Sequence, residues 1–143
     1  MLTIADIMTA NVITLSPNDT LRDAHELTRT KGIRHLPVID PVTQKLIAIV
    51  TQKAMIAKVI NLLTLYGNEA LVERERETNI MELAVVDFEP VSPSDEIATV
   101  ANFFLQNKHG CLPVTNSDGG LEGIVTSSDF VKLSVRLLAE RNN

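Results

Sequence analysis

The sequence contains two copies of one pattern, and this internal repeat limits the possible folds more than any other feature. Leu-Pro-Val at 36–38 recurs at 112–114, and Ser16-Pro17 also recurs 76 residues later. Ile-Val-Thr at 49–51 recurs at 124–126, a spacing of 75, so one residue is lost between these motifs. Anchors that keep their spacing over most of a chain indicate a duplication, in which one supersecondary unit is built twice.

Each copy begins with the pattern of a short strand followed by a helix. In the first copy the apolar run 11–15 predicts the strand, and Thr20 with Asp23 has the spacing of a helix-opening capping box. Gly32 suits the end of that helix, because glycine readily adopts the left-handed conformation found there. The counterpart helix in the second copy shows a stronger apolar stripe, which consists of Ile97, Val100, Ala101 and Phe104.

Two short apolar runs and a second helix follow in each copy. The runs 36–40 and 45–51 predict a hairpin, and the runs 112–116 and 121–126 predict its counterpart. Apolar residues at helical spacing then predict the second helices, with Met55, Val59 and Leu62/Leu63 in one copy and Phe130, Leu133 and Leu137/Leu138 in the other. The predicted unit is β-α-β-β-α, and the predicted fold class is α/β (α+β).

The repeat also suggests how the chain is divided. We expect the first repeat at 1–66, a charged helical linker at 67–79 and the second repeat at 80–143. One repeat alone would bury only about 60% of its surface and be marginal, so the two should share a core as one globular module. The alternating charges of 73–77 are typical of a solvated helical face.

Composition excludes several classes of function. A net charge of −5, 3% aromatic residues and no tryptophan argue against a nucleic-acid-binding surface. A single cysteine rules out an internal disulfide and a multi-cysteine zinc site, and agrees with a reducing compartment. We find no run of eighteen apolar residues and no secretion signal. The expectation is a soluble, cytoplasmic protein that contacts neither membrane nor nucleic acid.

The segment Gly-Ile-Val-Thr-Ser-Ser-Asp at 123–129 carries the clearest chemistry. Thr126 lies where a predicted strand turns into a helix, so free N–H groups and the positive end of the helix dipole offer a place for a phosphate. The carboxylate of Asp129, three residues later, can accept hydrogen bonds from two adjacent hydroxyls, which is what a ribose presents. The same pair also has the spacing of a capping box, which needs no ligand.

The two β-α-β-β-α copies, with Leu-Pro-Val opening each hairpin and Ile-Val-Thr leading into each second helix, resemble a pair of cystathionine-β-synthase-type (CBS) domains, a Bateman module. The resemblance covers nearly the whole chain and implies two repeats related by a pseudo-two-fold axis. It implies a regulatory module, not an enzyme, that binds AMP, ADP or ATP as a regulatory ligand and requires no cofactor. CBS pairs also commonly form homodimers.

The resemblance implies a role for individual residues. Asp129 would hold the ribose hydroxyls, and Thr126 with Ser128 would reach the ribose or the first phosphate. Adenine would lie against Ile124 and Val12. The phosphates would meet Arg34 and His35, because arginine's fork of donors matches phosphate oxygens.

The first copy carries alanine where the second carries the key residues of this motif. Ala48 stands in place of Gly123, and Ala54 stands in place of Asp129. A methyl group cannot accept a hydrogen bond, and leaving ribose hydroxyls unpaired would cost about 1–3 kcal/mol. We therefore expect one competent nucleotide site per chain.

Two other interpretations remain. An enzyme would have to use Cys111 with His109, or the three histidines as metal ligands, and neither set has a suitable pattern, so we expect no metal site. The stronger alternative is a ligand-independent interaction module, in which Asp129 is only a helix cap and Leu137 with Leu138 supports dimerisation. In either case the regulated target would be another protein, whose identity is unknown.

Overall fold

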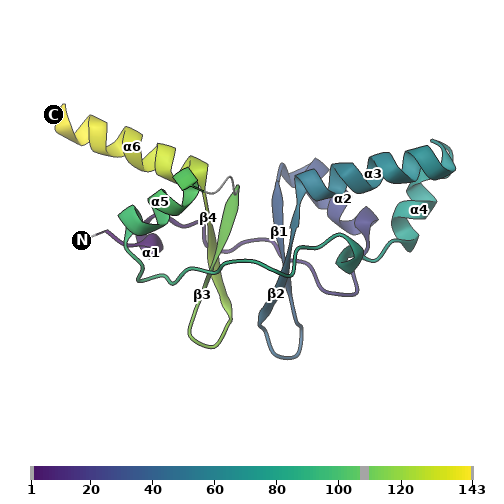
Figure 1. Ribbon diagram of the computed structural model, residues 1–143, viewed down its shortest axis with the longest axis horizontal. Helices are drawn as coiled ribbons and strands as arrows, with labels where there is room; N and C mark the ends of the chain where they lie inside the picture. Colours follow the sequence, from purple (N-terminus) through teal and green to yellow (C-terminus); the bar gives the residue numbers. More distant parts are fainter. Residues whose placement is uncertain (1, 107–109, 143) are drawn as a thin grey trace. The chain divides into compact units, whose positions relative to one another are not determined.

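The computed structural model describes residues 2–106 and 110–142. The chain divides into two compact units. The first-repeat unit consists of residues 13–88, and the second-repeat unit consists of the described residues up to Val12 together with those from Glu89 onward. Each unit contains a two-stranded antiparallel sheet with helices packed beside it (Figure 1). The predicted mixture of helices and strands in two tandem repeats is therefore confirmed.

The elements of each unit follow the predicted order of helix, hairpin and helix. The first-repeat unit contains α2 (Leu21–Lys31), β1 (His35–Ile39), β2 (Leu46–Thr51), α3 (Gln52–Tyr66), α4 (Leu71–Glu77) and the 3₁₀ turn η1 (Ile80–Glu82). The second-repeat unit contains α1 (Ile4–Ile7), α5 (Ile97–Gln106), β3 (Cys111–Thr115), β4 (Leu121–Thr126) and α6 (Ser127–Arg141). Both hairpins have the same register, with Val38 opposite Ala48 in one and Val114 opposite Gly123 in the other.

The helix ends behave as their sequences predict. Thr20 caps α2, and the carboxylate of Asp23 accepts a hydrogen bond of 2.9 Å from the Thr20 N–H. Gly32 ends α2 in the left-handed conformation, at φ 67°. Gly67 ends α3 at φ 82°, where an L-residue would be strained. Local sequence alone decides these boundaries.

The strand predicted at 11–15 is wrong, because only Leu15 of this run makes a bridge. Leu15 pairs in parallel with Val38 through two hydrogen bonds, to Pro37 and from Ile39. A longer parallel ladder would need an N–H from Pro37 on one side and from Pro17 on the other, and proline has none. The counterpart bridge between Val91 and Val114 in the second-repeat unit also consists of one residue pair. It lies between the prolines that are equivalent to Pro17 and Pro37.

The segment before each first helix packs in the unit of the other repeat. Ile4 of α1 donates a hydrogen bond to the carbonyl of Asp95, and Ile80 of η1 donates one to the carbonyl of Asp19. Both isoleucines are completely buried. Each unit therefore completes its core with a segment that is distant in sequence, while the repeat boundaries at 66 and 80 stay a prediction.

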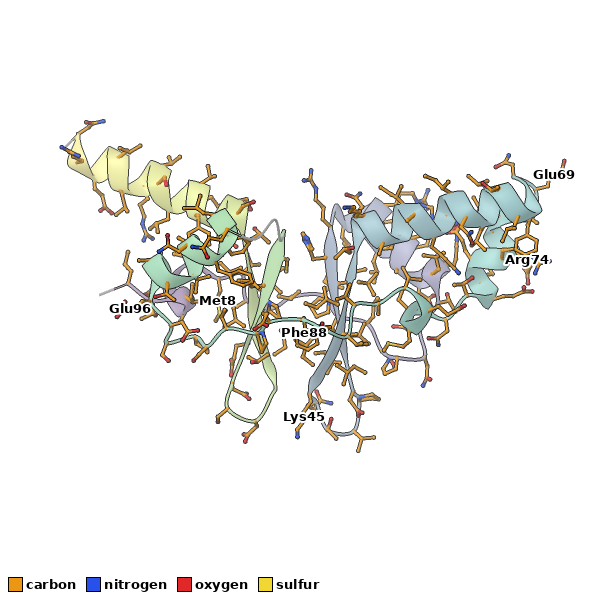
Figure 2. All side chains as sticks on the ribbon, viewed as in Figure 1. Met8, Lys45, Glu69, Arg74, Phe88 and Glu96 are labelled. Atoms are coloured by element: carbon orange, nitrogen blue, oxygen red, sulfur yellow. The ribbon has the colours of Figure 1, made fainter. Side chains whose placement is uncertain are left out.

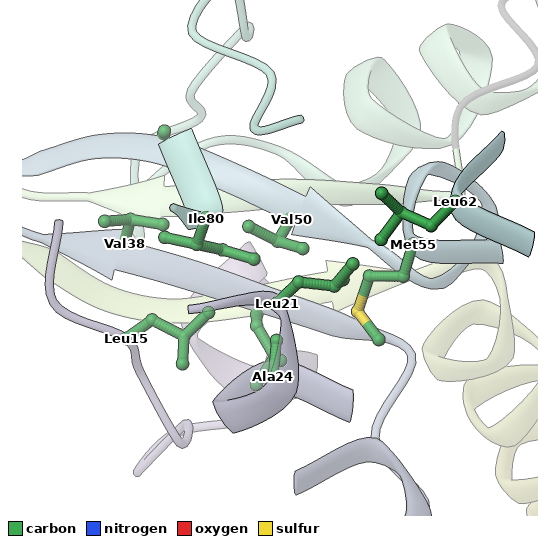
Figure 3. Close-up of a cluster of buried hydrophobic side chains, with 10 residues drawn as sticks. Leu15, Leu21, Ala24, Val38, Val50, Met55, Leu62 and Ile80 are labelled. Atoms are coloured by element: carbon green, nitrogen blue, oxygen red, sulfur yellow. The ribbon is translucent and has the colours of Figure 1, made fainter. Parts of the chain in front are cut away.

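The core of the first-repeat unit lies between its hairpin and its helices. Figure 3 shows Leu21 and Ala24 of α2, Val38 and Val50 of the hairpin, and Met55 and Leu62 of α3 in one cluster with Leu15 and Ile80. A fully buried side chain of this kind stabilises the fold by roughly 1.5–3 kcal/mol. The packing fixes the end of β2, from which α3 begins.

Helix α4 contains the alternating charges of 73–77, and the prediction of a solvated face is wrong for one of them. Glu75 is completely buried, and its Oε1 lies 2.6 Å from Nδ1 of His25 on α2. Its Oε2 lies 3.5 Å from Arg22 but accepts no hydrogen bond from the described residues. Arg74 of α4, which is labelled in Figure 2, lies with its guanidinium 3.8 Å from the centroid of the Tyr66 ring. The contacts of Glu75 with His25 and Arg22 thus hold α4 against α2.

Among residues 2–106 and 110–142, no helix is both long enough and apolar enough to span a membrane.

Candidate functional site

The candidate site is centred on the first turn of α6, which begins directly after β4. The Thr126 N–H donates a hydrogen bond of 2.8 Å to Oδ2 of Asp129, and the Thr126 hydroxyl lies 3.3 Å from the same oxygen. The hydroxyls of Thr126 and Ser128 are 2.8 Å apart. The capping box is present, and it leaves Oδ1 of Asp129 outside the cap.

Asp129 is 6% exposed, which is unusual for a carboxylate. Its Oδ1 lies 3.5 Å from the hydroxyl of Thr9, a residue 120 positions earlier in the chain. Thr9 forms an antiparallel bridge with Ile124 of β4. The site therefore includes a residue that the sequence analysis missed.

Gly123 allows this close approach. A Cβ atom at Gly123 would lie 2.6 Å from the carbonyl oxygen of Thr9 and 3.0 Å from Sδ of Met8. Backbone atoms cannot retreat from such a contact without moving the whole segment. The glycine of the motif thus has a structural reason of its own, which is the packing of the segment 2–12 against β4.

The equivalent position in the first-repeat unit has the same backbone and different chemistry. Val85 bridges Ile49 of β2, as Thr9 bridges Ile124. Ala54 occupies the place of Asp129, and its N–H donates a hydrogen bond of 3.1 Å to the side chain of Thr51. The second-repeat unit therefore has the polar residues Thr9 and Asp129 at two positions where the first-repeat unit has the apolar residues Val85 and Ala54. The predicted difference between the two copies therefore extends to a second residue.

The remaining predicted residues divide between the units. Ile124 is half-buried in β4 and Val12 is half-buried near the end of the segment 2–12, both in the second-repeat unit with Asp129. Arg34 is exposed directly before β1, and His35 is the half-buried first residue of β1, both in the first-repeat unit. Burial, and then the charge of Arg34, lower the pKa of His35. A neutral imidazole leaves Arg34 as the cation of this pair.

Cys111 lies beside the candidate site, opposite Thr126 in the β3–β4 ladder. Burial, and then the charge of Asp129, raise the pKa of its thiol to about 12. Because the thiolate is the reactive species, a nucleophilic role at neutral pH is disfavoured. His109, its possible partner, lies outside the described residues. No group of three His, Cys, Asp or Glu side chains within the described ranges could hold a metal ion.

We expect Cys111 to react at least 100-fold more slowly with a chromogenic disulfide reagent at pH 8 in the native protein than in urea, because its thiolate is scarce. The thiol of the unfolded chain has a pKa of about 8.5, so it loses its proton at a lower pH than the native thiol does. Ionisation of Cys111 should therefore lower the free energy of unfolding as pH rises from about 8.5 towards 12. Equal rates of reaction in the two states would contradict the assignment.

Comparison with known proteins gives a consistent result. The family model for the CBS domain matches residues 4–61 and 79–136. The structure resembles that of a Vibrio cholerae protein assigned to acetoin utilization (AcuB), with 33% identity, a TM-score of 0.81 and coverage of 99% of this chain and 96% of that one. It also resembles CBSX2 in complex with AMP, a protein from Arabidopsis thaliana, with 27% identity, a TM-score of 0.80 and coverage of 96% and 98%.

A curated relative, the uncharacterized protein MJ1225 of Methanocaldococcus jannaschii, is 30% identical over 131 residues, which are 91% of this chain and 42% of that protein. The chain spans less than half the length of the curated relatives that it matches.

Proposed function

Because the chain belongs to the CBS-domain family and carries two copies of that domain, we propose that it is a regulatory module, not an enzyme, that binds one adenine nucleotide at Asp129. One observation carries the proposal. A nearly buried carboxylate, with one oxygen outside its helix cap, stands at the start of α6, while alanine stands at the equivalent position of α3. The AMP complex of CBSX2, which is similar over almost the whole chain, supports the choice of ligand class.

The chemistry of the site suits a nucleotide. Asp129 would accept hydrogen bonds from the ribose, and Thr126 with Ser128 would contact the ribose or the first phosphate near the positive end of α6. Ile124 and Val12 would supply apolar contacts for adenine. Arg34 and His35 would meet the phosphates, with Arg34 as the main cation. The ligand would act as a regulatory signal rather than as a required cofactor.

Calorimetric titration of the protein with AMP, ADP and ATP tests this proposal. We expect saturable binding with one ligand per chain, because Ala54 cannot replace the acceptor that Asp129 provides. The order of affinities would show how many phosphates the site recognises. Absence of binding at millimolar nucleotide would refute the proposal and favour the ligand-independent interaction module.

The exposed faces of the two second helices support a homodimer as part of this proposal. Helix α3 exposes Ile56, Ile60 and Leu63, and α6 exposes Val131, Val135 and Leu138 at the equivalent positions. Leu137 is exposed as well, so the last leucines do not close the core of their own unit. Apolar stripes at helical spacing suit contact with a second copy. A separate protein, of unknown identity, would receive the signal, and one cysteine agrees with a cytoplasmic setting.

Replacing Ile60 and Val135 together with glutamate should convert the dimer to a monomer. Both side chains are more than half exposed, at 58% and 63%, so the change should leave each unit folded. In a two-fold interface each glutamate would face a copy of itself or an apolar surface, and the dissociation constant should rise at least about 100-fold. Light scattering during size exclusion measures this. Val42→Glu, on an exposed loop, is the control. A dimer that persists in the double variant contradicts the interface.

A further inference from the structure

We propose that Thr9 recognises the ribose together with Asp129, so that the two adjacent hydroxyls are bound by Oδ1 of Asp129 and by the hydroxyl of Thr9. This inference rests on the proposed nucleotide site and names a further residue in it. It differs from the simpler arrangement in which the two carboxylate oxygens bind both hydroxyls.

The hydrogen bonds of Asp129 argue for this division. Oδ2 already accepts the Thr126 N–H at 2.8 Å and lies 3.3 Å from the Thr126 hydroxyl. A ribose hydroxyl on Oδ2 would compete with a cap worth about 1 kcal/mol. Oδ1 lies 3.5 Å from the Thr9 hydroxyl, which is long for a hydrogen bond. A ribose could replace this contact with two better hydrogen bonds, one donated to Oδ1 and one made with the Thr9 hydroxyl. One oxygen of the carboxylate is thus committed to the helix, and the other faces Thr9.

The backbone holds Thr9 at this place. Its N–H donates to the carbonyl of Ile124 at 2.8 Å, and its carbonyl accepts from the Ile124 N–H at 3.0 Å. Gly123 makes the close approach possible, because any side chain there would collide with the Thr9 carbonyl. Thr9 itself is exposed and can meet a ligand. Because the N–H and the carbonyl of Thr9 are both hydrogen-bonded, the backbone that carries its hydroxyl has a defined position before any ligand binds.

The other unit shows that the fold does not need a hydroxyl at this position. Val85 makes the same two backbone hydrogen bonds with Ile49, at 2.8 and 2.9 Å. Valine has the shape of threonine without its hydroxyl, and it stands where Ala54 replaces Asp129. The hydroxyl and the carboxylate are therefore present together in one unit and absent together in the other. This pairing points to a shared ligand rather than to a structural role for Thr9.

Titration of Thr9→Val and Thr9→Ser with AMP, 2′-deoxy-AMP and 3′-deoxy-AMP tests the inference. The wild-type protein should bind AMP about tenfold more tightly than the deoxy analogue that lacks the hydroxyl facing Thr9. Thr9→Val should bind AMP about tenfold more weakly and lose that preference, because no partner for this hydroxyl remains. Thr9→Ser should keep both the affinity and the preference. Thr30→Val, on α2, is the matched control.

The possible results separate this inference from the proposed function. If Thr9→Val binds all three nucleotides as the wild type does, while Asp129→Ala binds none, the nucleotide site stands and the role of Thr9 is refuted. If Thr9→Val binds AMP more weakly but keeps the preference for AMP over the deoxy analogue, Thr9 has only a structural role, and its role in recognising the ribose is also refuted. If the wild type binds no nucleotide, both proposals fail. Because Val85 occupies the equivalent position, the valine variant should fold, and circular dichroism and its melting temperature verify this.

Discussion

Asp129→Ala should reduce the affinity for adenine nucleotides at least about 100-fold. The variant removes the one acceptor that stands at the start of α6 and has no equivalent in α3, where Ala54 takes its place. Hydrogen bonds to a charged group contribute about 1.5–3 kcal/mol each, so the loss of one or two brings the affinity down to the range of non-specific binding. Calorimetry with AMP, ADP and ATP measures the effect.

The chain provides a matched control for this variant. Asp23 of α2 accepts the Thr20 N–H at 2.9 Å, in the same capping-box geometry as Asp129 with Thr126. Asp23→Ala should therefore cost the same helix cap, about 1 kcal/mol of stability, with no effect on binding. If Asp129→Ala and Asp23→Ala bind nucleotides equally well, Asp129 is only a cap, and the site must be sought elsewhere.

His25→Leu should lower the free energy of unfolding by about 2–3 kcal/mol, the largest stability effect that we expect from a single surface-accessible residue. Glu75 is completely buried, and His25 holds its Oε1 at 2.6 Å. The leucine variant leaves a buried carboxylate with only Arg22, at 3.5 Å, as a partner. Urea denaturation monitored by circular dichroism measures the change.

Glu75→Leu provides the decisive comparison. Removing the acid leaves Arg22 and His25, which are about a third exposed and can be hydrated, so the loss should be smaller, near 1 kcal/mol. The double variant His25→Leu with Glu75→Leu should recover most of the stability lost in His25→Leu, because no unpaired buried charge remains. Arg76→Leu, which breaks an exposed pair with Glu73, should stay within about 0.5 kcal/mol of the wild type. Additive losses in the double variant would contradict the coupling.

The parts of the fold that were predictable depend on local chemistry. A capping box, a glycine in the left-handed conformation and alternating apolar runs each act within a few residues, so α2, both hairpins and α3 could be located before the structure was known. The strand predicted at 11–15 was wrong for a reason that is not local. Leu15 pairs with Val38, and Pro17 and Pro37 lack the N–H groups that a longer parallel ladder between these two segments would need.

The candidate site was predictable only in part. Thr126 and Asp129 are three residues apart on one helix turn, so a motif could identify them. Thr9 lies 120 residues from Asp129, and no local pattern relates the two. One signal was present in the repeat alignment, since Thr9 aligns with Val85 as Asp129 aligns with Ala54. The roles of Arg34, His35, Val12 and Ile124 stay predictions that the nucleotide titrations can test.

The sequence by itself determined the duplication, the order of elements in each copy, the caps of the helices and the difference between Asp129 and Ala54. These features follow from residues close together in the chain, whose interactions do not depend on the rest of the molecule. Only the tertiary structure decided that α1 and η1 each complete the core of the other repeat's unit. It also decided that Glu75 is buried against His25 and that Thr9 lies beside Asp129. The physical reason is that burial and long-range pairing depend on how distant segments pack, and alternating charges or a single threonine look the same in a sequence whether they face water or a neighbouring helix.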